Sequence, residues 1–533
     1  MRARNAAAAT VLLVVIVGRI AAQEHVHRPD ASREELGTVH FQTSCSPAAA
    51  PQFDRAVALL HSFEFGASIR AFTQVLGVDS TCAMAHWGVA LSRWGNPVAP
   101  GIRGPAQLRP GQAAADAAMR LSANATERER QYVSAVAKLY AASDQVDQPT
   151  RVVAYERAMA DLVAKQPADT EAKIFYAISL VASAPPTDKT YANQIKAGDI
   201  LEPIWAKQPN HPGLAHYIIH TYDAPALAGR AKAAAQRYAR IAPSAAHALH
   251  MPSHTFTRVG LWTESVETNL RSIDVARRDS SIGEMLHASD YAEYAYLQMR
   301  RDAAAKAILD GLPTLEARFD PNVIAGAAPG SAGVFAIAAI PARYALERRD
   351  WKTAANLVPK PSKFPWTEAM VYFARALGAS HTGDPVTAHS SVDSLAAIRQ
   401  RVDDMNERYW AEQVAIQQLA AEAWLAHAEH HDELALSRMR EAANREDATE
   451  KSAVTPGPLA PARELLGDLL LELRRPKEAL VEYRATLLKE PMRYRSLDGA
   501  RRAASASGDR RAEASYAAQL RQLTGKGSKR SSR

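Results

Sequence analysis

The sequence predicts an all-α protein made of stacked helix pairs, and three observations carry that prediction. Ala, Leu, Arg and Glu are abundant while only 7% of residues are aromatic, a composition that favours helices. Runs of alternating β-branched residues, which would predict strands, are nearly absent. A recurring pattern also starts at Ala197, Ala231 and Ser265, and each start lies 34 residues after the one before it.

The pattern consists of a small residue, a bulky residue four later and an apolar pair, often followed by a proline twelve residues after the start. The small residue lets two helices approach, the bulky residue fills the gap, and proline ends the second helix because it has no N–H to donate. Each pair hides its remaining apolar face by stacking on the next pair. Because 34 residues is the tetratricopeptide length, we expect a tetratricopeptide-like helical-repeat superhelix, an α-solenoid, over residues 40–525.

The array is expected to continue irregularly beyond the clear copies. Further helical stretches are predicted over 285–312, 335–358 and 366–399, and loops rich in Gly or Pro over 95–111, 182–189, 321–333 and 455–461.

The two ends of the chain differ from its body. Residues 1–22 have a basic start, a short apolar run and small residues before Gln23, which is typical of a secretory signal peptide. We therefore expect an exported protein, periplasmic or extracellular, with no stable membrane span after cleavage. Residues 23–39 are interpreted as a flexible segment and 526–533 as a disordered basic tail.

The positive net charge is concentrated at these ends. The chain carries +7 overall, of which +7 falls in residues 501–533 and +3 in residues 1–22, so the body between them carries −3. A near-neutral body gives no electrostatic reason to expect binding to nucleic acid.

The chain has two cysteines, Cys45 and Cys82. In an exported protein an even pair favours a disulfide, which would tie the N-terminal segment to the first repeat. A thiol metal site is the alternative, although the CxxC spacing typical of such sites is missing.

Four histidines form two pairs with equal internal spacing, and the pairs are one repeat apart. His216 and His220 lie in HYIIH, and His250 and His254 lie in HMPSH, 34 residues later. Residues four apart share a helix face, and stacked repeats place equivalent helices side by side. Four imidazoles on one surface would suit zinc or copper. The competing interpretation is that these histidines only cap helices, pack, or bind a peptide carboxylate.

Several segments resemble a group of secreted bacterial tetratricopeptide-repeat proteins with HYxxH and HxxHMxSH motifs and no assigned reaction. They are FQTSC, LHSFEFGASIRAF, CAMAHWGVALS, HPGLAHYIIHTYDAP, APSAAHALHMPSHTFTRVGLW, DYAEYAYLQ and TPGPLAPARELLGDLLLE. One departure stands out, since members of that group carry EKHPVTPG where this chain reads EKSAVTPG, with Ser452 in place of a histidine.

The tetratricopeptide register implies that the histidines face the concave, ligand-holding surface. In that register positions 2, 5, 9 and 12 of the first helix point inward. His216 and His250 fall at position 5 and His220 and His254 at position 9. His247 falls at position 2 and Asp223 at position 12, which adds both to the candidate metal ligands. His287, with Asp290 and Tyr291 beside it, is a weaker candidate.

Two functions remain open from the sequence. No HExxH, phosphate-binding glycine loop or GxSxG motif occurs, which favours a non-enzymatic scaffold that binds a protein or peptide partner on its concave face. The alternative is a metal-dependent enzyme or metal-binding protein centred on the histidine pairs. Four filled positions would make a metal structural, whereas three protein ligands and a water would permit hydrolysis or redox chemistry.

Overall fold

The computed structural model describes residues 34–99 and 101–525, and in these residues every regular element is a helix. The all-α fold class is therefore confirmed. The predicted signal peptide (1–22), most of the segment 23–39 and the tail 526–533 lie outside the described residues. None of the described helices is long and apolar enough to cross a membrane.

The helices follow one another with short connections. They are α1 (Ala50–His61), α2 (Phe65–Val78), α3 (Ala83–Trp94), α4 (Pro105–Leu121), α5 (Glu127–Lys138), α6 (Gln148–Lys165), α7 (Thr170–Ser183), α8 (Ala192–Lys207), α9 (Pro212–Thr221), α10 (Lys232–Ile241), α11 (Ala246–His250), α12 (Pro252–Arg258), α13 (Trp262–Arg278), α14 (Ile282–Gln298), α15 (Asp302–Glu316), α16 (Gly330–Arg348), α17 (Trp351–Ala355), α18 (Pro365–Thr382), α19 (Pro385–Asp404), α20 (Arg408–Ala428), α21 (Asp432–Asp447), α22 (Ala462–Glu472), α23 (Pro476–Lys489), α24 (Tyr494–Ser507) and α25 (Arg510–Leu523). Short 3₁₀ turns lie at Pro47–Ala49, Ser122–Asn124 and Ala228–Ala231.

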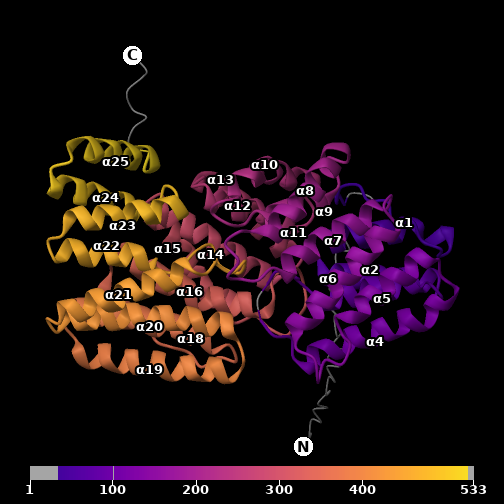
Figure 1. Cartoon of the computed structure of the whole chain (residues 1–533), viewed down its shortest axis with the longest axis horizontal. Helices are drawn as coiled ribbons and strands as arrows, with labels where there is room; N and C mark the ends of the chain where they lie inside the picture. The colour runs from indigo at the N-terminus through magenta and orange to yellow at the C-terminus, as the bar shows by residue number, and fades with distance from the viewer. Residues whose placement is uncertain (1–33, 100, 526–533) are drawn as a thin grey trace, which may run out of the picture. The chain divides into compact units, whose positions relative to one another are not determined.

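Consecutive helices pack against each other in pairs, and alternate helices pack as well. Helices α7 and α9 are in contact, as are α16 with α18, α18 with α20, and α22 with α24. The C-terminal helices can be followed as such a stack in Figure 1. This pattern of neighbours is the helical-repeat arrangement predicted from the sequence.

The repeat residues have the packing roles expected of them. Ala197, Ala231 and Ser265 are fully buried, and helices α8 and α10 end just before Pro209 and Pro243, respectively. The first helices of the successive pairs around them are α7, α9, α11 with α12, and α14. The histidine pairs therefore lie on first helices.

One predicted boundary was wrong, and its cause is local. Helix α4 begins inside the expected loop 95–111 because Pro105 occupies a first-turn position, where its missing N–H costs nothing. The three predicted helical stretches are helical, and each holds parts of two helices separated by a residue with a left-handed backbone. These residues are Arg300 in 285–312, Arg349 in 335–358 and Gly383 in 366–399.

The N-terminal part packs onto the repeats earlier than expected. Leu36 and Val39 are buried, and the backbone N–H of Thr38 donates to the carbonyl of Asn210 at 3.0 Å. Residues 35–39 therefore belong to the packed body, because Leu36 and Val39 are buried in the same hydrophobic core as residues of α9. Cys45 and Cys82 are joined by a disulfide with a Cα–Cα distance of 5.0 Å.

Buried charges connect four helices in the second half of the chain. Arg493, before α24, has no exposed side-chain area and lies 2.6 Å from Glu347 on α16 and 2.7 Å from Glu464 on α22. Its Nη1 donates to the hydroxyl of Tyr294 on α14 at 2.9 Å. Buried ions need such partners, because an unpaired charge in the interior is strongly destabilising.

Candidate metal centre

The structure gathers the predicted histidines into two groups of three instead of one group of four. The first triad is His216 and His220 from α9 with His247 from α11. The second triad is His250 from α11 and His254 from α12 with His287 from α14. Within each triad one donor nitrogen from every histidine lies within 4.8 Å of the other two. All six side chains are at most 6% exposed.

The fold keeps together the two pairs predicted from spacing and adds a third histidine to each. Pro252 starts a new short helix after Met251, because proline cannot donate the hydrogen bond that would continue α11. The second pair still shares one face across this break. His247 joins the first pair, while His287 completes the second triad although it stood as a weaker candidate.

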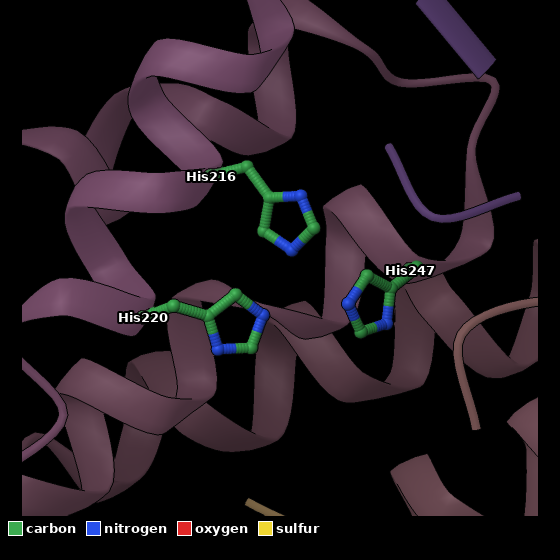
Figure 2. A group of neighbouring side chains, drawn as sticks. All are labelled: His216, His220 and His247. Atoms are coloured by element: carbon green, nitrogen blue, oxygen red, sulfur yellow. The ribbon is translucent and has the colours of Figure 1, made fainter. Parts of the chain in front are cut away.

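The first triad surrounds a common space, as Figure 2 shows. His216 Nδ1 lies 2.6 Å from the backbone carbonyl oxygen of His61. A carbonyl can only accept, so Nδ1 carries the proton and Nε2 keeps its lone pair. His216 Nε2, His220 Nε2 and both nitrogens of His247 are buried without a hydrogen-bond partner among the described atoms. Glu284 Oε2 lies 3.7 Å from His247 Nδ1, beyond hydrogen-bond length.

The second triad has its tautomers fixed from outside. His254 Nδ1 donates to Asp223 Oδ2 at 2.9 Å, and His250 Nδ1 donates to Asn269 Oδ1 at 2.7 Å. The amide of Asn269 is oriented by its own Nδ2, which donates to the Ser265 carbonyl at 2.6 Å. Both histidines therefore carry their proton on Nδ1 and present a bare Nε2.

These two bare nitrogens face each other at 3.1 Å. With neither bearing a proton, two lone pairs at that distance repel, whereas a cation bound to both would remove the repulsion. Two nitrogens that each lie 2.0–2.1 Å from a zinc ion and 3.1 Å from each other subtend roughly 95–102° at the ion, close to the tetrahedral angle. The separation of the two Nε2 atoms is therefore compatible with the geometry of two ligands of one zinc ion.

Asp223 lies outside the ligand groups and acts on them through hydrogen bonds. Besides His254, its carboxylate accepts from Arg258 Nε at 2.9 Å and from Lys451 Nζ at 3.0 Å. Burial would raise the pKa of Asp223, but the charges of Lys451 and Arg258 hold it well below its usual range. The sequence predicts Asp223 either as a metal ligand or as a partner that orients one, and its hydrogen bond to His254 Nδ1 fits the second role.

The triads are covered instead of lying on an open groove. The ring of Phe63, in the turn after α1, lies 4.3 Å from that of His216 between centroids. On the other side the hydroxyl of Tyr291 donates to the Thr455 carbonyl at 2.9 Å, in the same segment as Lys451. Ser452 is also buried there, so the departure from the resembled group lies beside the second triad.

Sequence reasoning missed several residues that shape the site. Lys451 and Arg258 reach Asp223 over distances along the chain that no local pattern reveals. Glu171 and His211 form a third buried group with His61.

Burial favours the neutral form of five triad histidines. Burial, and after it the charges of neighbouring imidazoles, lowers the pKa of His216, His220 and His250 well below 6.5. Burial likewise lowers the pKa of His254 to about 4 and that of His287 to about 3. Neutral imidazole is the form that binds metal ions.

We expect the metal-free protein to lose stability steeply as the pH falls from 6.5 toward 4. In this range the unfolded chain protonates histidines near their ordinary pKa of 6.5, while folded His254 and His287 stay neutral. The unfolded state therefore binds more protons, and each such histidine contributes about 1.4 kcal/mol per pH unit to the slope. Urea unfolding across this range measures it. His254→Gln is expected to make the slope shallower, and a pH-independent midpoint would contradict the neutral cluster.

Comparisons with known proteins identify no family. No protein-family model matches the chain, and no curated protein matches it. Among solved structures, the human IFIT1 dimer with m7Gppp-AAAA is similar at 10% identity over 83% of this chain and 90% of that one, with a TM-score of 0.37. Yeast Tom70 is similar at 12% identity over 87% and 96%, and the APC/C hetero-tetramer Cut9–Hcn1 at 12% over 90% and 87%, both with a TM-score of 0.32. At these TM-scores the likenesses support no conclusion about function.

Proposed function

We propose that this protein binds two transition-metal ions, one in each histidine triad, on a helical-repeat scaffold. The observation that carries the proposal is the approach of His250 Nε2 and His254 Nε2, both without protons, to 3.1 Å. An all-imidazole donor set suits zinc or copper, whereas magnesium and calcium prefer oxygen ligands. The first triad supports the same conclusion, because its buried donor nitrogens have no other partner in the described structure.

Nearby carboxylates offer charge compensation for two dications. Asp223 serves the second triad through His254, and Glu284 lies beside the first. Glu64 Oε1 accepts the backbone N–H of His247 at 3.1 Å. Burial, and after it the charge of Glu284, raises the pKa of Glu64 to about 8. A cation in the first triad would favour ionisation of Glu64, so binding of a metal ion there releases a proton near neutral pH.

Metal-assisted catalysis is the second function that a specific observation favours. Three protein ligands per ion leave a position for water or a substrate. A cavity of about 90 Å³ reaches Arg258 and Lys451, which both contact Asp223, and its walls include Trp366 and Trp410. A small polar molecule bound there would be linked to His254 through Arg258 or Lys451 and then Asp223.

The scaffold and export hypotheses remain part of this proposal. The helical-repeat architecture suits the binding of a protein or peptide partner on a face outside the covered triads. Export to the periplasm or the extracellular space is proposed from the signal-like residues 1–22. The disulfide between Cys45 and Cys82 supports an oxidising compartment.

Titration of the metal-free protein with zinc and copper ions tests the proposal. We expect two ions per chain, with His220→Ala removing the ion of the first triad and His254→Ala that of the second. His389→Ala is the control, because this histidine is 56% exposed and pairs with Glu429 at the surface, and it is expected to keep both ions. Substoichiometric metal in the wild-type protein, or unchanged stoichiometry in both triad variants, would refute the proposal.

A further inference from the structure

A third group of donors lies next to the first triad and has different chemistry. His61 at the end of α1, Glu171 in the first turn of α7 and His211 before α9 are all buried, and one donor atom from each lies within 4.8 Å of the others. Glu171 accepts from His61 Nε2 and from His211 Nε2, each at 2.9 Å. Two histidines and one carboxylate thus converge.

The group can exchange its internal hydrogen bonds for a metal ion without losing protons. His61 Nδ1 lies 3.1 Å from the hydroxyl of Tyr217, which can accept as well as donate. His61 can therefore carry its proton on Nδ1 and turn the lone pair of Nε2 inward. His211 Nδ1 is buried without a partner among the described residues, so moving the proton of His211 from Nε2 to Nδ1 breaks no further hydrogen bond.

The close packing at this point depends on Gly213. A Cβ atom added there would lie 2.5 Å from His61 Nδ1 and 3.1 Å from His211 Cε1. Any larger residue would push the two rings apart. The convergence of the group is thus fixed by the backbone of α9.

The group also lies between solvent and the first triad. Glu171 and His211 line a cavity of about 690 Å³ that opens past the exposed residues Thr38 and His40. On the inner side, the carbonyl of His61 accepts from His216 Nδ1 at 2.6 Å. His61 therefore contributes a metal-donor nitrogen to this group, and its carbonyl orients His216 of the first triad.

We propose that His61, Glu171 and His211 form a third metal site, filled only during transfer, that captures divalent ions from solvent and delivers them to the first triad. This inference rests on the proposed two-ion function. Delivery is a ligand exchange in which the ion leaves Glu171 and the two histidines for the imidazoles of the first triad, with no change of oxidation state. A carboxylate in the set weakens retention of soft ions relative to the all-imidazole triads, which favours onward transfer.

Loading kinetics with Co²⁺, followed by its visible absorption, test this site. Glu171→Gln is expected to keep the two ions of the triads at equilibrium but to load them at least about tenfold more slowly, because losing a ligand weakens a metal site at least as much as losing a residue that supports one. Glu127→Gln, which changes an exposed glutamate on α5, is expected to load at the wild-type rate. His211→Gln provides a second variant and is expected to slow loading in the same way.

The outcomes separate the two proposals. A wild-type protein that binds no Co²⁺ would overturn the two-ion function and the uptake site together. A wild-type protein that binds two ions, with Glu171→Gln and His211→Gln loading at its rate, would overturn the uptake site alone.

Discussion

Replacing Asp223 with alanine is expected to weaken metal binding at the second triad about 10–100-fold and to lower the free energy of unfolding by about 3–5 kcal/mol. The carboxylate fixes the tautomer of His254 and neutralises Arg258 and Lys451, all buried. Removing it leaves these two cations without their shared partner and frees the imidazole to rotate. The first triad is expected to keep its ion.

Isothermal titration and urea unfolding measure the two effects of Asp223→Ala. Asp274→Ala is the matched control, because Asp274 is 70% exposed and forms only a surface pair with Arg277, where little change is expected. Asp223→Asn retains one accepting oxygen and is expected to be milder on both counts. Wild-type affinity and stability in Asp223→Ala would show that the buried carboxylate does not support the site.

Replacing Arg493 with methionine is expected to lower the free energy of unfolding by about 3–5 kcal/mol. The guanidinium lies between Glu347 and Glu464, both nearly inaccessible to solvent, and also donates to Tyr294. Methionine fills part of the volume but removes the cation that Glu347 and Glu464 share, which leaves Glu464 with Arg495 as its ion-pair partner. Because Arg493 joins the C-terminal helices to α14, the loss is expected to be global.

Chemical denaturation followed by circular dichroism tests the Arg493→Met prediction. Arg475→Met is the control, since Arg475 pairs with Glu478 one turn away on the surface and such pairs contribute little. Equal midpoints for both variants would mean that the buried ion pairs do not hold these helices together.

The repeat could be predicted because its determinants are local. Ala231, Tyr238 and Pro243 form one copy whose spacing fixes the helix, its packing residue and its end. The breaks at Arg300 and Arg349 could not be predicted, because arginine carries no signal for a left-handed backbone and only tertiary packing imposes it. The start of α4 at Pro105 was missed because proline is compatible both with loops and with a first helical turn.

The site was predictable only as far as it follows the repeat. His216, His220, His250 and His254 were found because their pairs are one repeat apart. Their division into two triads depends on His247 and His287, whose contributions follow from the angles between neighbouring helices. Lys451 lies more than two hundred residues from Asp223 along the chain, so its role needed the three-dimensional structure.

X-ray absorption spectroscopy of the protein loaded with two zinc ions tests whether the imidazoles of the two triads bind the metal. We expect an inner shell with about three imidazole nitrogens per zinc at ~2.0–2.1 Å. His254→Ala is expected to bind about half as much zinc as the wild type. An inner shell made only of oxygen ligands, or a spectrum with the same zinc content in His254→Ala as in the wild type, would contradict binding by the triads.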